Sequence, residues 1–328
     1  GHLARAVNAG QAEQALAFWR ESGEQAGELR ALNLLAIAWA TQSRHEKALA
    51  LAEEALTLAR RLKNRDGEAQ ALYNLGFSAR SLSRWQPAKE HFEQALAIYR
   101  ELGDRWNEGR GMTQLGIVLG RLREAEKSLA FYEQALAINR EVNDRVGAAR
   151  TLNSLGIFYQ QAEQPEKALS FYEQGLALSR ELKDSVLEAR LLNNMGQLYS
   201  LTDRYEEALQ AAEQVLAIHR VNQDRAGEGR ALEAMVIGWL YLGYHQKAID
   251  VGLQALSIHR EFKSKTGEAT VLHNLGNAHI HLNQPEQAAE YYRQSRAIKV
   301  EIKDRAGATR SLMGVGNALA VVGNHAEA

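Results

Sequence analysis

A repeat of forty residues runs through this chain of 328 residues and constrains its fold more than any other feature. Residues 144–150 read DRVGAAR, and the similar segments DRAGEGR and DRAGATR follow at 224–230 and 304–310. A period of this length is typical of solenoids and propellers, so we expect one supersecondary unit to recur along the chain. The forty-residue blocks begin at Gly27, Gly67, Asn107, Gly147, Leu187, Gly227, Gly267 and Gly307.

Within each block the apolar residues recur at intervals of three and four, which is the period of an amphipathic helix. In one block Leu152 and Leu155 mark a first helix, Ala168 and Phe171 mark a second, and the polar segment 162–165 separates them. Each block therefore predicts a hairpin of two helices. HEAT and armadillo arrays have the same element content, whereas a WD40 propeller would require strands with two-residue alternation, and the blocks lack it.

The segments between the predicted helices contain proline and glycine, which commonly end helices. Pro165 and Pro285 fall in the turn inside a block, and glycine takes this place at Gly243 and Gly323. The second helix is expected to run up to Asp184, whose short carboxylate is suited to cap the next helix.

Columns of small and large residues distinguish among the helical repeats, because small residues let two helices approach and large ones fill the space between hairpins. A Leu-Gly pair or a close variant recurs at Leu75-Gly76, Leu115-Gly116, Leu155-Gly156, Met195-Gly196, Leu275-Gly276 and Val315-Gly316. Twelve residues after these glycines stand Ala88, Ser128, Ala168, Ala208 and Ala288. Four residues further on, large aromatic residues expected in the core stand at Phe92, Tyr132, Tyr172 and Tyr292.

At these positions the chain resembles the tetratricopeptide repeat over essentially its whole length. The period of forty instead of 34 lengthens the second helix, as in the arrays of Pins/LGN-type adaptors, kinesin light chains and bacterial signalling proteins. The resemblance implies an all-α, right-handed superhelical solenoid of antiparallel helix hairpins, with first helices that line a concave groove. It implies binding and not catalysis, so we expect no enzyme.

The repeat pattern predicts a single solenoid over residues 1–328. Residues 1–26 are expected to form a partial N-terminal repeat, 27–306 seven repeats of forty residues, and 307–328 a truncated eighth repeat. Because a solenoid normally ends in a polar capping element, we expect the native array to continue beyond Ala328.

Composition excludes several classes of partner. The 39 Lys and Arg residues balance 40 Asp and Glu residues, so no global field attracts nucleic acid or an anionic membrane. The absence of cysteine excludes disulfides and Cys-ligated zinc and is compatible with a cytoplasmic location. No apolar run approaches the roughly 18 residues of a membrane span. We expect no cofactor and no metal; His273, His279 and His281 share one helix without the spacing of a zinc helix.

A recurring arginine marks a second face of the first helices. Positions four, seven and eleven residues after it lie on the same side of a helix, away from the Leu-Gly face. A stripe of arginines, amides and aliphatic residues suits a protein or peptide partner with acidic residues and apolar anchors, and the resemblance implies peptide contact there. Alternatively, each arginine forms a surface ion pair. The candidate binding residues are Arg110, Arg150, Arg190, Arg230, Ile117, Ile157, Ile237, Asn74, Asn153, Asn193, Asn194 and Asn274, with the stretch from Arg110 to Arg230 as the expected centre.

A second arginine column is predicted to be structural, because its members lie near helix C-termini and four of them precede an aspartate by four residues. Its members are Arg60, Arg100, Arg140, Arg180, Arg220 and Arg260.

Two functions remain open. The chain is either a scaffold that binds a peptide or partner domain in its groove, or the regulatory or sensor arm of a larger signalling protein with a STAND-type NTPase or a CHAT-type protease.

Overall fold

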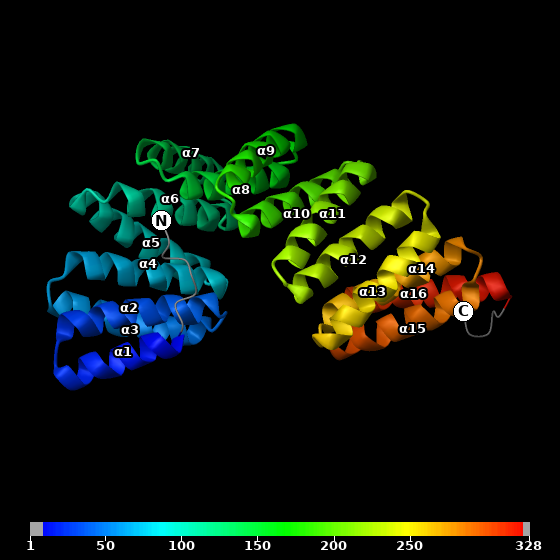
Figure 1. The fold of residues 1–328 in the computed structure, drawn as a ribbon, viewed down its shortest axis with the longest axis horizontal. Coiled ribbons are helices and arrows are strands. Elements are labelled where there is room, and N and C mark those ends of the chain that lie inside the picture. Colours follow the sequence, from blue (N-terminus) through cyan, green and yellow to red (C-terminus); the bar gives the residue numbers. More distant parts are fainter. Residues whose placement is uncertain (1–8, 324–328) are drawn as a thin grey trace. The chain divides into compact units, whose positions relative to one another are not determined.

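The computed structural model describes residues 9–323, and all regular structure in this part of the chain is α-helical (Figure 1). None of the described helices has the length and apolarity needed to cross a membrane. The helices are α1 Ala9–Ser22, α2 Gln25–Thr41, α3 His45–Arg61, α4 Arg65–Ser81, α5 Trp85–Leu102, α6 Arg105–Arg121, α7 Ala125–Glu141, α8 Arg145–Gln161, α9 Pro165–Glu181, α10 Ser185–Leu201, α11 Tyr205–Val221, α12 Arg225–Tyr241, α13 His245–Glu261, α14 Lys265–His281, α15 Pro285–Glu301 and α16 Arg305–Val322.

The expected all-α architecture of consecutive helix hairpins is confirmed. Even-numbered helices are the first helices of the blocks and odd-numbered helices are the second ones. The contacts divide the chain into two compact units, Gly1–Ala162 and Glu163–Ala328, which we describe separately. Residues 1–8 and 324–328 lie outside the described part, and with them the start of the expected partial repeat and the second helix expected from Ala328.

Capping aspartates start five of the described first helices, α6, α8, α10, α12 and α16, as predicted for Asp184. Its Oδ1 accepts a hydrogen bond from the Leu187 backbone N–H at 3.0 Å. Asp144 caps α8 in the same way, with Gly147 as the donor at 2.9 Å. Because these carboxylates satisfy a backbone donor that the helix leaves unpaired, they fix where these five helices begin.

The turns follow one geometry that is only partly visible in the sequence. Gly243 and Gly323 have positive φ values of 80° and 79°, as expected of glycines in a turn that ends a helix. Pro165 forms the first residue of α9 and does not lie within the turn, since its missing N–H is harmless there. Arg123 and Asn143 adopt left-handed conformations with φ of 64° and 54°, so most turns of this array hold a non-glycine residue in a conformation that costs free energy.

Small residues face large rings inside the hairpins, as the columns predict. Phe92 and Tyr172 are fully buried. A Cβ atom on Gly76 would lie only 2.8 Å from the Phe92 ring, and a Cβ on Gly116 only 2.7 Å from the Tyr132 ring. At Gly76, Gly116 and Gly276 the second helix therefore approaches more closely than a side chain permits, whereas a Cβ on Gly196 would make an ordinary contact of 3.5 Å.

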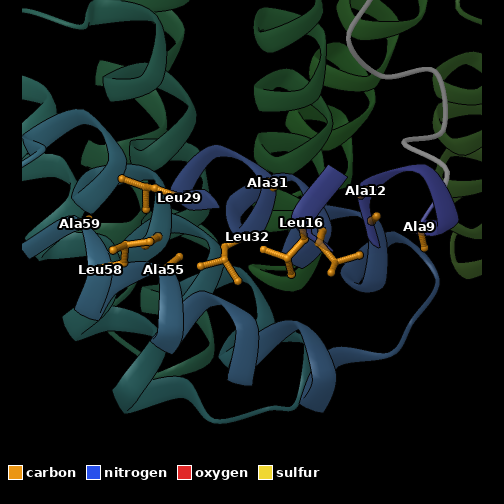
Figure 2. Close-up of a cluster of buried hydrophobic side chains, with 12 residues drawn as sticks. Ala9, Ala12, Leu16, Leu29, Ala31, Leu32, Ala55, Leu58 and Ala59 are labelled. Atoms are coloured by element: carbon orange, nitrogen blue, oxygen red, sulfur yellow. The ribbon is translucent and has the colours of Figure 1, made fainter. Parts of the chain in front are cut away.

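The first unit also contains an interdigitated aliphatic core formed by α1, α2 and α3 (Figure 2). Leu16 of α1 packs into this cluster beside Leu29 and Leu32 of α2, and Leu58 of α3 closes the other side. Each of these leucines is at least nine-tenths buried. Helix α1 therefore covers the apolar side of α2, in the place where the second helix of a preceding hairpin would pack.

Candidate functional site

The predicted binding residues all lie on first helices, and in both units several neighbouring first helices pack side by side. Helix α4 contacts α6 and α6 contacts α8 in the first unit, while α12 contacts α14 in the second. Residues at equivalent repeat positions are therefore presented on adjacent helices within a unit.

Arg110 is the most constrained of the four candidate arginines. Its guanidinium lies 4.9 Å from the centroid of the Tyr73 ring and 4.5 Å from that of Trp106. It also donates a hydrogen bond of 2.9 Å to the Asn107 Oδ1. Cation–π contacts hold the charge in one place, but the side chain stays half-exposed.

Arg150 and Arg190 are exposed on α8 and α10. Among residues 9–323, no ion pair, side-chain hydrogen bond or ring contact engages either guanidinium. Arg230 of α12 is also exposed and lies 3.7 Å from Asp224, a weak contact at the surface. The ion-pair alternative therefore does not account for Arg150 or Arg190.

The three candidate isoleucines, Ile117, Ile157 and Ile237, are half-buried, so each keeps an aliphatic surface that a ligand can cover. The candidate asparagines differ among themselves. Asn74 is buried, and its amide donates to the Asn33 Oδ1 at 3.1 Å, so this amide links the neighbouring first helices α2 and α4. The remaining asparagines are the buried Asn153, the exposed Asn193 and the half-buried Asn194 and Asn274.

Five of the six arginines of the second column form ion pairs between helices, but the predicted aspartate partner was wrong; the sixth, Arg140, has Ala148 at the position of the pairing glutamate. Arg100 Nε donates to the Glu108 Oε1 at 2.8 Å, and Arg105 reaches the same carboxylate at 2.6 Å. The aspartate four residues on, Asp104, instead caps α6 through the Asn107 N–H. The glutamate eight residues on is therefore the partner, because the turn between the helices brings it back to the arginine. Equivalent pairs are Arg60–Glu68, Arg180–Glu188, Arg220–Glu228 and Arg260–Glu268.

The three histidines of α14 point to three different partners. The His273 Nδ1 lies 3.2 Å from the Ser311 hydroxyl, the His279 ring stacks on Tyr291, and the His281 ring stacks on His245. Their side chains therefore do not converge on a common point.

A buried polar network lies between α14, α15 and α16. The Lys299 ammonium donates to the Ser311 hydroxyl at 3.1 Å, and this hydroxyl lies 3.1 Å from that of Ser295. Burial lowers the pKa of Lys299 and lowers that of His273 to about 4. Lysine beside serine is an arrangement that some hydrolases use, but both serines are fully enclosed.

The same repeat positions in the first unit hold Thr113, Thr151 and Asn139, which form an uncharged hydrogen-bonded set. The network around Lys299 thus occupies a repeat position at which buried polar side chains connect neighbouring hairpins by hydrogen bonds.

A second titratable pair connects α12 and α13. The His259 Nε2 lies 3.1 Å from the Glu233 Oε2, although it is not aligned for a hydrogen bond. Desolvation raises the pKa of Glu233 to about 7, and Arg230 opposes this rise. Burial and Arg230 lower the pKa of His259, and Glu268 raises it.

This pair predicts a specific pH dependence of stability. Because the folded-state pKa of Glu233 is raised from 4.5 to about 7, its favourable contribution is present below pH 4.5 and is lost as pH rises through 7. The stability of Glu233→Gln relative to the unchanged protein should therefore rise as pH increases from 4.5 to 7, and should reach about 3 kcal/mol at pH 8. Urea unfolding of both proteins from pH 4.5 to 8 checks this. A constant difference across the range would contradict the assignment.

Two of the candidate residues, Ile237 and Asn274, are brought together at a cavity of the second unit. The cavity has a volume of about 350 Å³ and lies between α12, α14 and α15. Sequence reasoning placed Ile237 on the binding face and Tyr292 in the core, but did not place them in one site. The lining residues are Ile237, Leu240, Tyr241, Asn274, Asn277, Ile280, His281 and Tyr292.

The sequence matches the family model described as "Tetratricopeptide repeat" over residues 29–101, 109–181, 147–220 and 240–299. No curated protein is significantly similar in sequence.

Several solved structures have a similar fold. The signal-transduction ATPase with numerous domains (STAND) from Pyrococcus horikoshii, which has a tetratricopeptide repeat sensor, matches with a TM-score of 0.75 and 13% identity, over 96% of this chain and 50% of that chain. The Rap conjugation gene regulator of plasmid pLS20, in complex with the Phr* peptide, matches with a TM-score of 0.59 and 15% identity, over 88% and 78%. The kinesin-light-chain TPR-like repeats from Podosopora anserina match with a TM-score of 0.51 and 19% identity, over 59% and 95%.

Proposed function

Because this chain belongs to the tetratricopeptide repeat family, we propose that it is a protein-interaction scaffold that binds peptide segments on the face of its first helices. The observation that carries this proposal is the contrast between two arginine columns. Arg100, Arg180 and Arg260 are held by glutamates of the next helix, whereas Arg150 and Arg190 are exposed and unengaged within residues 9–323. Arginines such as Arg150 and Arg190, which recur at the same repeat position and whose guanidinium groups form no ion pair or hydrogen bond among the described residues, are available to bind a partner.

The favoured partner carries acidic residues around apolar anchors. A guanidinium offers paired donors that match a carboxylate. In each unit an isoleucine follows the arginine by seven residues, two helical turns away on the same side, as Ile157 follows Arg150 and Ile237 follows Arg230. Carboxylates would fix the register of the peptide, and burial of its apolar side chains would supply most of the affinity.

The similar structures support a role in peptide binding. The Rap regulator was solved in complex with the Phr* peptide, and the STAND protein uses its repeats as a sensor. We propose that this chain, like other tetratricopeptide arrays, binds and does not catalyse.

Selection from random peptides tests the proposal, because it does not require the natural partner to be identified first. A library of random dodecapeptides displayed on phage is panned against the purified chain, and the enriched peptides are measured by isothermal titration calorimetry. We expect acidic, apolar peptides that bind with micromolar affinity and more weakly as salt increases. Failure to enrich any peptide above a bare-surface control would contradict peptide binding.

A second candidate function is that of a sensor arm in a larger signalling protein. It is favoured by the similarity to the STAND ATPase, of which this chain spans half the length. Sequencing the complete gene tests it: an adjoining reading frame for an NTPase or a CHAT-type protease domain would support the arm, and a gene that encodes repeats alone would contradict it.

A further inference from the structure

We propose that the cavity between α12 and α14 is the anchor site for one uncharged aliphatic or aromatic side chain of an extended peptide. This inference rests on the proposed function and deepens it, because it assigns the main apolar contact to a defined place in the second unit.

Comparison among the repeats shows that this cavity is specialised. At the repeat position of Leu240 and Ile280, the other described first helices carry small, polar or charged residues, namely Ala40, Arg80, Gly120, Gln160, Ser200 and Ala320. At the next position, an aromatic ring is present only at Tyr241 and His281 among the described repeats; the others carry Thr41, Ser81, Arg121, Gln161, Leu201 and Val321. Two adjacent helices thus change both positions together, and these four side chains all line the cavity.

The lining selects against charge. It contains no Asp, Glu, Lys or Arg, and its walls are the aliphatic side chains of Ile237, Leu240 and Ile280 with the ring of Tyr292. A charged side chain placed there would lose its hydration without gaining an ionic partner. A volume of about 350 Å³ is at the small end of the range of ligand pockets, and suits a single large side chain.

Two carboxamides at the cavity are suited to hold a peptide backbone. Asn274 and Asn277 are one turn apart on α14, so both project to the same side. The Asn277 Oδ1 accepts a hydrogen bond of 2.7 Å from the Tyr292 hydroxyl, which fixes the amide and leaves its N–H groups to donate. Within residues 9–323 no hydrogen bond engages the Asn274 side chain. A carboxamide that both donates and accepts matches the N–H and C=O groups of an extended chain.

The rim of the cavity is an ordered aromatic surface. The ring of Tyr241 is stacked on Tyr205 with centroids 4.4 Å apart and an interplanar angle of 1°, yet 65% of Tyr241 is exposed. Rings held in place in this way lose little conformational freedom on binding, which favours contact with a ligand.

The test compares the cavity with exposed positions on second helices of the same unit. Peptides selected as above are titrated against Ile237→Gln and Asn274→Ala, with Leu253→Gln on α13 and Gln210→Ala on α11, both exposed residues, as controls. We expect about a tenfold loss of affinity for each cavity variant and less than about a twofold change for each control. Circular dichroism and melting temperature establish that all four variants are folded.

A change in the peptide provides a test that needs no protein variant. Replacing the one large apolar residue shared by the selected peptides with aspartate should weaken binding about a hundredfold. If the selected peptides bind the cavity variants with unchanged affinity, the anchor site is refuted while peptide binding itself stands. If no peptide is selected at all, both the anchor site and the proposed function fail.

Discussion

Replacing Arg190 and Arg230 together with glutamate is expected to weaken the binding of the selected acidic peptides by at least about a hundredfold. Both side chains lie on the first-helix face of the second unit. A hydrogen bond to a charged group contributes about 1.5 to 3 kcal/mol, and reversal replaces two such contacts by repulsion. Because both side chains are exposed, the fold should change little. Calorimetric titration of the double variant measures the loss.

The matched control reverses Lys183 and Lys263, which are exposed residues of turns in the same unit with φ of 54° and 53°. This variant undergoes the same change in net charge, so it separates a local contact from a general electrostatic effect. We expect it to keep its affinity to within about a factor of three at physiological salt. Equal losses in the two double variants would show that only overall charge matters.

Replacing Phe92 with alanine should reduce the free energy of unfolding by about 3 to 5 kcal/mol. The ring is fully buried and packs edge-to-face on Tyr73, with centroids 5.6 Å apart. It also fills the space that Gly76 leaves open, so truncation creates a cavity between α4 and α5. Urea unfolding followed by circular dichroism measures the change in the transition midpoint.

Leu102→Ala is the control on the same helix, because 45% of this residue is exposed. It should cost much less, within roughly 1 kcal/mol. A Phe92 variant as stable as the Leu102 variant would mean that the column of large residues does not hold the hairpins together.

The fold was predictable because one period governs both sequence and packing. The spacing of three and four within blocks predicts the hairpins, and the capping carboxylate of Asp184 marks the start of α10 to the residue. The small residues of the Leu-Gly column indicate close helix approach, which the contacts of Gly76 with Phe92 confirm.

The contacts of charged side chains were less predictable, because they depend on the path of the turns. Asp104 is close in sequence to Arg100, but its carboxylate is used to cap α6, and the turn brings Glu108 to the arginine instead. The left-handed residue that shapes the turn after α7 is Asn143, with φ of 54°, and no glycine marks it. When two acidic residues follow an arginine in the sequence, the sequence alone therefore does not specify which of them forms the ion pair.

The cavity of the second unit could not be predicted from the sequence, because it depends on how three helices are arranged in space. Tyr292 was correctly predicted to be buried, and it is 4% exposed. Its hydroxyl nevertheless reaches Asn277 at the cavity wall, because the ring spans from the core of the hairpin to the space between α12 and α14. The sequence does contain large aliphatic residues, Leu240 and Ile280, at a repeat position where the other described repeats have small, polar or charged residues. This difference indicates a cavity only once α12 and α14 are known to lie side by side.

Site-specific photo-crosslinking tests most directly which face of the array binds. The photoreactive residue p-benzoyl-phenylalanine is placed at Gln197, exposed on the first helix α10, or at Gln210, exposed on the second helix α11. After irradiation with a selected peptide, mass spectrometry measures the crosslinked fraction of each variant. Binding on the first-helix face predicts a crosslink from position 197 and none above background from position 210. A crosslink from position 210 alone would contradict this account and assign binding to the second helices.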